Sequence, residues 1–94
     1  MIKFNDSVRD RFLRYTTYDT MSDGNACGKK RPTTDGQEEL LLVLKKELEE
    51  LGLETYYGEE KVVMGVLKGN TEGTTIGFMA HVDTADDCNG NNVK

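Results

Sequence analysis

A leucine stripe in the middle of the chain is the sequence feature that most constrains the fold. The stripe follows the spacing of one helix face and consists of Leu41, Leu44, Leu48 and Leu51. Lysines and glutamates occupy the opposite face, so the pattern predicts an amphipathic helix. Thr34 and Gln37 have capping-box spacing at its start. Gly52 stands where a left-handed residue ends a helix, and Leu53 is expected to pack back on Leu48.

A shorter helix is predicted before this one. Val8, Phe12 and Tyr15 are spaced to share one helix face, and the polar residues at positions 5–7 include good helix caps. The segment 16–35 contains two glycines and the only proline, and it is predicted to be a loop.

The second half of the chain changes to a strand pattern. Residues 55–57 and 61–67 are rich in β-branched and aromatic side chains, and Gly58-Glu59-Glu60 separates them, which predicts a hairpin. After a turn-rich stretch at 69–73, residues 74–80 are uncharged and apolar on both faces, as in a strand covered on both sides. Helices, a hairpin and a buried strand together predict an α/β layered fold, with its site beyond a strand's carboxyl end.

Composition excludes several classes of function. The 94 residues suit one small domain with a modest core. Seventeen acidic against twelve basic residues give a net charge of −5, which disfavours nucleic acid as a partner. The longest aliphatic run, 40–44, is far too short to span a membrane. Cys27 and Cys88 are distant from each other, and free thiols in the cytosol are expected.

The only histidine directly follows the predicted buried strand. In extended backbone, residues two positions apart point to the same side, so His81 and Asp83 are expected to share a face while Val82 turns inward. A carboxylate placed in this way fixes the imidazole tautomer and makes the other ring nitrogen a better zinc donor. The motif alone is also compatible with a solvated surface histidine. Asp86 and Asp87 are typical of a solvated turn.

Residues 77–85 and 89–94 together resemble the first metal motif of the peptidase T family, within the M20 zinc metallopeptidases. The likeness extends upstream through the segments 11–15, 19–23, 36–53 and 63–67. It therefore covers essentially the whole chain, although only the segment around His81 is specific for chemistry.

The resemblance implies a cytoplasmic peptidase that removes the amino-terminal residue of tripeptides with two zinc ions. It implies a three-layer sandwich of the zinc-exopeptidase type, of which residues 1–94 would be an incomplete amino-terminal part with no second domain. His81 corresponds to a zinc ligand and Asp83 to the catalytic aspartate that orients it. The family's other ligands and its general base would lie beyond Lys94, so the chain alone is expected to be inactive. The implied partner is a small peptide substrate, and the oligomeric state stays open.

Two departures and two alternatives qualify this interpretation. Asp86 stands where the family usually has proline, and Cys88 where an aromatic residue is common, which puts substrate preference in doubt. A related zinc amidohydrolase acting on N-acyl amino acids would share the motif of His81 and Asp83. The second alternative is a non-catalytic interaction module, in which the leucine-striped helix would be the partner surface and His81 would be incidental.

Overall fold

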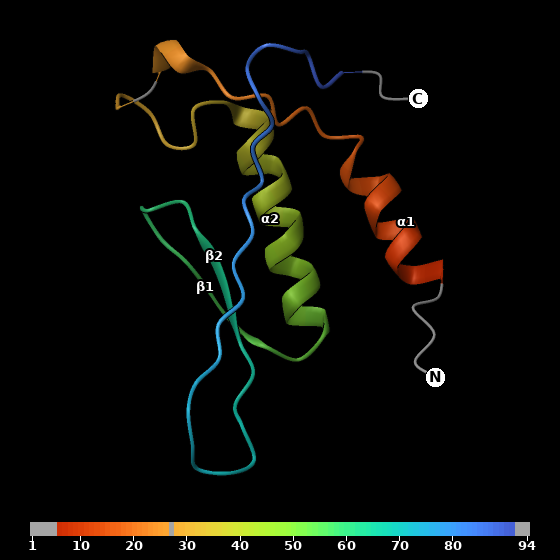
Figure 1. Cartoon of the computed structure of the whole chain (residues 1–94), viewed down its shortest axis with the longest axis vertical. Helices are drawn as coiled ribbons and strands as arrows, with labels where there is room; N and C mark the ends of the chain where they lie inside the picture. Colours follow the sequence, from red (N-terminus) through yellow and green to blue (C-terminus); the bar gives the residue numbers. More distant parts are fainter. Residues whose placement is uncertain (1–5, 27, 92–94) are drawn as a thin grey trace.

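The computed structural model describes residues 6–26 and 28–91. Its elements in chain order are α1 (Asp6–Tyr15), the short 3-10 helix η1 (Gly24–Ala26), α2 (Asp35–Glu50), β1 (Glu54–Tyr57) and β2 (Val63–Val66). In Figure 1, α2 runs through the middle of the molecule, with the hairpin of β1 and β2 on one side and α1 on the other. The mixed α/β class predicted from the sequence is confirmed.

Helix α2 begins where the sequence predicts, but its first turn is bonded differently. Thr34 precedes the helix in an extended conformation and makes no side-chain cap. Its hydroxyl instead donates to the carbonyl oxygen of Met21 at 2.8 Å. The Gln37 amide donates to the hydroxyl oxygens of Thr34 and Thr33, at 3.0 and 3.1 Å. The predicted capping box is therefore wrong in its bonding, because the Thr34 hydroxyl oxygen accepts from the Gln37 side-chain amide while its proton is donated to the preceding loop.

The end of α2 agrees with prediction. Gly52 has φ of 90°, and its N–H donates to the carbonyl of Glu49 at 2.9 Å. The N–H of Leu53 donates to the carbonyl of Leu48 at 3.1 Å, which completes a Schellman ending. The Leu48 and Leu53 side chains both reach Gly65 of β2, with their nearest atoms 3.1 and 3.0 Å from the point where Gly65 would carry a Cβ. The helix end is thereby fixed against β2.

The predicted hairpin is confirmed as an antiparallel pair, with Glu54 opposite Val66 and Tyr57 opposite Val63. It is attached to α2 through the carboxylate of Glu38. Both the Tyr57 hydroxyl and the Lys61 ammonium donate to this carboxylate, at 2.7 and 2.5 Å. This three-residue contact lies at the loop end of the hairpin, opposite the Schellman ending.

Helix α1 is confirmed, but its predicted apolar face is largely uncovered. Val8 is 54% exposed and Phe12 is 65% exposed. The attachment to α2 is polar, because the Tyr15 hydroxyl donates to Glu47 and Arg14 forms an ion pair with the same carboxylate. None of the helices in the described residues has the length and apolar character needed to cross a membrane.

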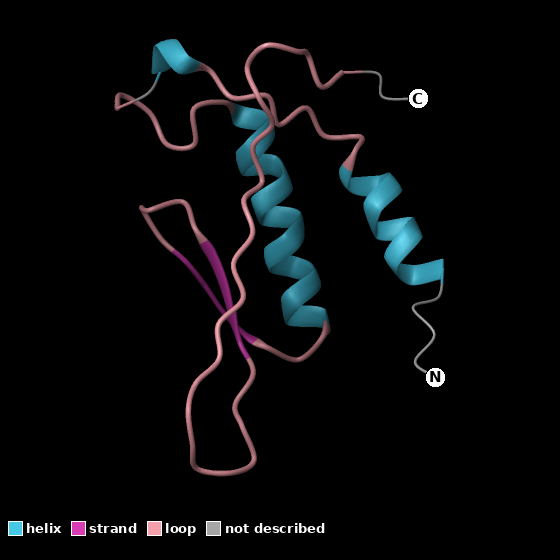
Figure 2. Cartoon of the chain, viewed as in Figure 1, coloured by secondary structure: helices cyan, strands magenta, loops and turns pink. Residues whose placement is uncertain are grey.

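The expectation of a buried strand at 74–80 is wrong. The segment is irregular chain, drawn as a loop in Figure 2, and among the described residues it joins no strand. Ile76, Phe78 and Met79 are 75%, 95% and 100% exposed. The physical reason is that β1 and β2 pair only with each other, so the described chain supplies nothing to cover this segment.

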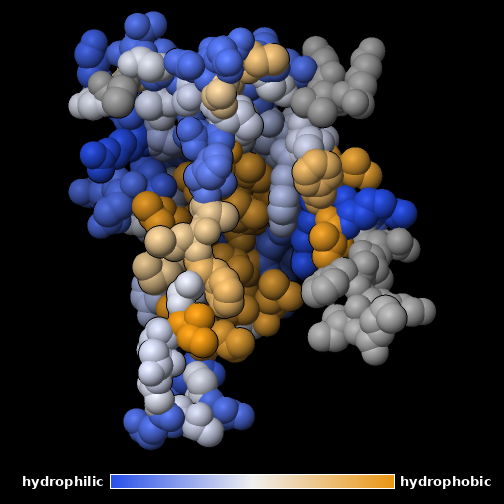
Figure 3. Space-filling view, in the orientation of Figure 1, coloured by the Kyte–Doolittle hydropathy of each residue, from blue (hydrophilic) through white to orange (hydrophobic). Residues whose placement is uncertain are grey.

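Apolar side chains are gathered but poorly covered. Leu40 and Leu41, each 7% exposed, are the only buried apolar residues in the described part of the chain. Figure 3 shows apolar surface in the middle of the molecule, between more hydrophilic ends. The core is therefore small and lies on the leucine-striped face of α2.

Candidate metal site at His81 and Asp83

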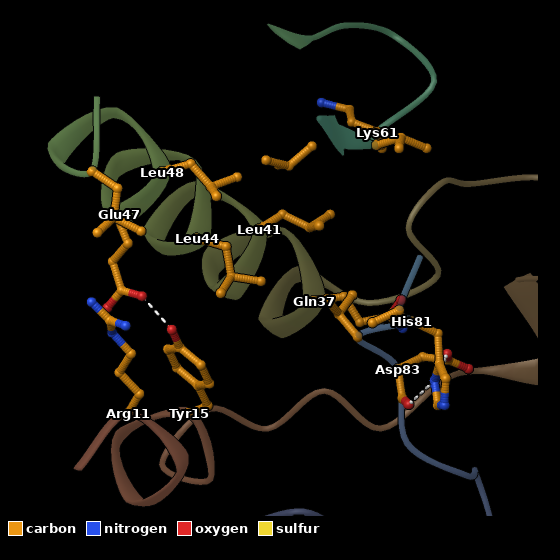
Figure 4. Close-up of a pocket in the computed structure, with 15 residues that line it drawn as sticks. Arg11, Tyr15, Gln37, Leu41, Leu44, Glu47, Leu48, Lys61, His81 and Asp83 are labelled. Carbon is orange, nitrogen blue, oxygen red and sulfur yellow. Dashed lines mark hydrogen bonds and ion pairs between the residues drawn. The ribbon is translucent and has the colours of Figure 1, made fainter. Parts of the chain in front are cut away.

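The side chains of His81 and Asp83 converge as predicted. His81 Nδ1 lies 2.9 Å from Asp83 Oδ1 and 2.9 Å from the Asp83 carbonyl oxygen, and Figure 4 shows the two side chains facing each other. A carbonyl oxygen can only accept, so Nδ1 carries the proton in this arrangement. Nε2 of the neutral ring then keeps its lone pair, which is the state in which histidine binds a metal ion.

The site is open to solvent. The His81 side chain is 83% exposed and that of Asp83 is 49% exposed. Val82, between them, is half-buried, in agreement with the predicted alternation of side chains. Asp86 and Asp87 lie in an exposed turn, as the sequence indicates.

A short parallel bridge holds the residue that follows the site. The Thr84 N–H donates to the Thr20 carbonyl at 2.9 Å, and the Ser22 N–H donates back to the Thr84 carbonyl at 2.9 Å. The Ser22 hydroxyl donates to the same carbonyl at 3.0 Å, and Thr20 is only 5% exposed. Asp83 is therefore one residue from a point fixed to the loop between α1 and α2.

Close packing at Asp19 completes this support. A Cβ on Gly36, in the first turn of α2, would overlap the Asp19 carbonyl oxygen. A Cβ on Gly90 would lie 2.8 Å from Asp19 Oδ1, and this oxygen accepts from the Met21 N–H at 3.2 Å. Two glycines thus let the loop, α2 and the segment after the site approach one another.

Sequence analysis missed the residues that support the site. Thr20 and Ser22 lie in a segment predicted to be a loop, where Met21 is the one apolar residue of positions 19–23. Two residues of a single bridge give no period that a pattern could reveal. Gly36 resembled an ordinary residue of the helix start, and only its closeness to Asp19 shows its role.

Two cavities lie on either side of residues 80–82. The first, of about 460 Å³, is bounded by α1, α2 and the start of β2, and its charged lining comes from Arg11, Glu47, Lys61 and Asp83. The second, of about 450 Å³, is bounded by α1, α2 and the loop after α1. Ala80, His81 and Val82 line both cavities, so the start of the site forms the wall between them.

The described residues fit part of a zinc site. Within residues 6–26 and 28–91, no three or more histidine, cysteine or acidic side chains are grouped to hold a metal ion. A catalytic zinc ion takes three protein ligands. His81, oriented by Asp83, has the chemistry of one such ligand. Cys88 is an exposed free thiol as predicted, whereas Cys27 and the family-like residues 92–94 lie outside the described residues.

Comparison with known proteins relates this chain to peptidases over nearly its whole length. The similar proteins are named peptidase T, which confirms the resemblance seen around His81. Peptidase T of Staphylococcus carnosus strain TM300 is 45% identical over 91 residues, or 95% of this chain and 22% of that protein. Peptidase T of Staphylococcus aureus strain JH9 is 45% identical over 87 residues, or 90% of this chain and 21% of that protein. The chain thus spans about a fifth of these relatives' length, and no family model matches it.

Proposed function

We propose that this chain forms part of a zinc-dependent tripeptide aminopeptidase of the peptidase T type. The observation that carries the proposal is the 2.9 Å contact between His81 Nδ1 and Asp83 Oδ1, in a segment similar to peptidase T. In this proposal the complete enzyme is cytoplasmic and folds as a zinc-exopeptidase sandwich, and its substrates are tripeptides.

His81 and Asp83 have separate roles in the proposed site. His81 binds zinc through Nε2, while Asp83 accepts the Nδ1 proton, holds the ring in one orientation and makes Nε2 more basic. Bound zinc would supply a water molecule acidic enough to attack the peptide carbonyl at neutral pH. Because His81 is a single ligand, the chain alone is proposed to bind zinc weakly and to lack peptidase activity.

The test is a chimera in which this chain replaces the matching part of Staphylococcus carnosus peptidase T. The chimera is expected to bind zinc and to release the amino-terminal residue of a tripeptide. His81→Ala should release the zinc ion that His81 binds and abolish hydrolysis, because the metal loses a direct ligand. Zinc content by mass spectrometry and release of the amino-terminal residue are the two measurements.

Asp87→Asn is the matched control, since Asp87 lies in the exposed turn beside the site and should leave both measurements unchanged. Full zinc content and activity in the His81→Ala chimera would sink the proposal. An active chimera that cleaves N-acyl amino acids but not tripeptides would assign the site to an amidohydrolase instead.

A further inference from the structure

A third cavity, of about 350 Å³, joins the loop before α2 to the candidate metal site. Residues 22–24 and 30–33 of that loop line it, and so does Asp83. The side chain of Gln37, only 6% exposed, completes the lining. In Figure 1 the loop lies at the amino-terminal end of α2. Small-molecule sites in proteins have volumes of about 300–1,000 Å³, so this cavity has room for a small group of a ligand.

Hydrogen bonds hold the loop wall of this cavity in place. The Thr33 hydroxyl oxygen accepts from the Asp23 N–H at 3.0 Å and from the Gln37 side-chain amide at 3.1 Å. On the other side of Arg31, the N–H of Lys30 donates to the carbonyl oxygen four residues earlier, at 3.1 Å. Arg31 therefore lies between two fixed points of the loop.

Arg31 is the charged side chain of this lining that is left without a partner. The other three are engaged: Lys30 forms an ion pair with Asp35 at 2.5 Å, Asp83 faces the histidine of the candidate site, and Asp23 accepts a backbone N–H at 2.9 Å. Within the described residues, Arg31 is exposed and forms no ion pair or side-chain hydrogen bond. Its guanidinium has the planar fork of donors that binds a carboxylate through two hydrogen bonds.

The two carboxylates in the same lining decide which anion fits. Asp23 and Asp83 repel a free anion such as phosphate, but they attract a ligand that carries a cationic group together with its own carboxylate. A short peptide with a free amino terminus and an acidic side chain has both charges.

The position of Asp83 favours a side-chain carboxylate over the carboxyl terminus of a peptide. Asp83 belongs both to this cavity and to the candidate metal site. When an aminopeptidase cleaves a tripeptide, the side chains of the first two residues flank the scissile bond, whereas the carboxyl terminus is one residue further away. A group that enters the cavity beside Asp83 is therefore one of those side chains.

We propose that Arg31 gives this site a preference for peptides with an acidic side chain, whose carboxylate it binds in the cavity shared with Asp83. This inference rests on the proposed function for its choice of a peptide as the ligand. Arg31 determines specificity and takes no part in bond cleavage. The binding needs neither zinc nor hydrolysis, because the cavity is formed by the 94-residue chain.

Two peptides that each carry one carboxylate test the inference. Ala-Glu-Ala amide has its carboxylate on the side chain, and Ala-Gln-Ala has it at the carboxyl terminus. Each is titrated into the zinc-free 94-residue chain, and binding is followed by the NMR signals of the backbone amides that line the cavity. We expect Ala-Glu-Ala amide to bind more tightly. Arg31→Gln should weaken this binding by about fivefold, the upper end of what an exposed ion pair contributes.

Lys29→Gln is the matched control. Lys29 is an exposed cation of the same loop that does not line the cavity, and its substitution removes the same charge. The affinity for Ala-Glu-Ala amide should therefore stay unchanged. Arg31→Lys should keep part of the affinity, because an ammonium retains the charge but not the paired donors.

Three results would overturn the inference. The first is that Arg31→Gln leaves the titration with Ala-Glu-Ala amide unchanged, whether or not the peptide binds. The second is tighter, Arg31-dependent binding of Ala-Gln-Ala, which would assign the cavity to a carboxyl terminus. The third is tighter binding of inorganic phosphate than of either peptide. A chimera without peptidase activity would contradict the proposed function instead, and the titration would still decide the role of Arg31.

Discussion

The two-residue spacing of His81 and Asp83 is enough to bring their side chains into contact. The spacing places both side chains on one side of the chain, and the carboxylate then accepts the Nδ1 proton at 2.9 Å. This arrangement needs no further residue, because it follows from the alternation of an extended backbone. The contact was therefore predictable from the sequence, whereas the metal that it would orient remains a proposal.

Asp83→Asn should weaken zinc binding in the chimera by about 10- to 100-fold, the usual effect of losing a partner that orients a ligand. The amide keeps the size of the side chain but removes the negative charge that makes the ring more basic. A zinc titration with a competing chelator measures the change. An affinity equal to that of the unsubstituted chimera would show that Asp83 does not support the metal.

Gly36→Ala should destabilise the isolated chain by about 1–3 kcal/mol, because the added methyl group must displace the Asp19 backbone. The free energy of unfolding from urea titration gives the value. Gly77→Ala is the control, since a Cβ at Gly77 meets nothing within 4 Å and should change stability by less than about 0.5 kcal/mol. Equal stability of the two variants would contradict the packing described at Asp19.

At the scale of elements, prediction succeeded where the signal was local. The leucine period and Gly52 define α2 from within its own sequence, and the composition of 55–67 defines the hairpin. The prediction of a buried strand at 74–80 was wrong because such a strand depends on neighbouring strands that its own sequence cannot supply. The bridge from Thr84 to the loop was not predicted, because its two partners are far apart in the chain.

The contact between Glu38 and the hairpin should make stability depend on pH. The Lys61 ammonium, and then the Tyr57 hydroxyl, lower the pKa of Glu38 below its ordinary value of 4.5 by hydrogen bonding to the charged form. A carboxylate with a lowered folded pKa stabilises the fold above about pH 4.5, and this contribution is lost as pH falls through the folded pKa. We expect the unfolding free energy to decrease on acidification.

Glu38→Gln should make the unfolding free energy fall less steeply on acidification, because the amide does not titrate. Urea titrations at pH 7 and at pH values on both sides of 4.5 measure the effect. Glu39→Gln, at an exposed neighbouring position on α2, is the comparison. A Glu38→Gln chain with the full acid sensitivity of the original would show that this contact does not link the hairpin to pH.

At the scale of the whole molecule, the chain is expanded for its length. Its radius of gyration is 15.5 Å, against about 13 Å for a compact domain of this size. Few buried apolar residues and a long uncovered segment account for the difference. The described chain therefore holds the site's first two residues in place without enclosing them.

The bridge between Thr84 and the loop at 20–22 also has a consequence for protein engineering. A recombination boundary placed between positions 22 and 84 would take the two halves of this bridge from different parents. Exchanges between this chain and its relatives should therefore keep residues 20–84 as one inherited block, although the histidine motif itself is only three residues long.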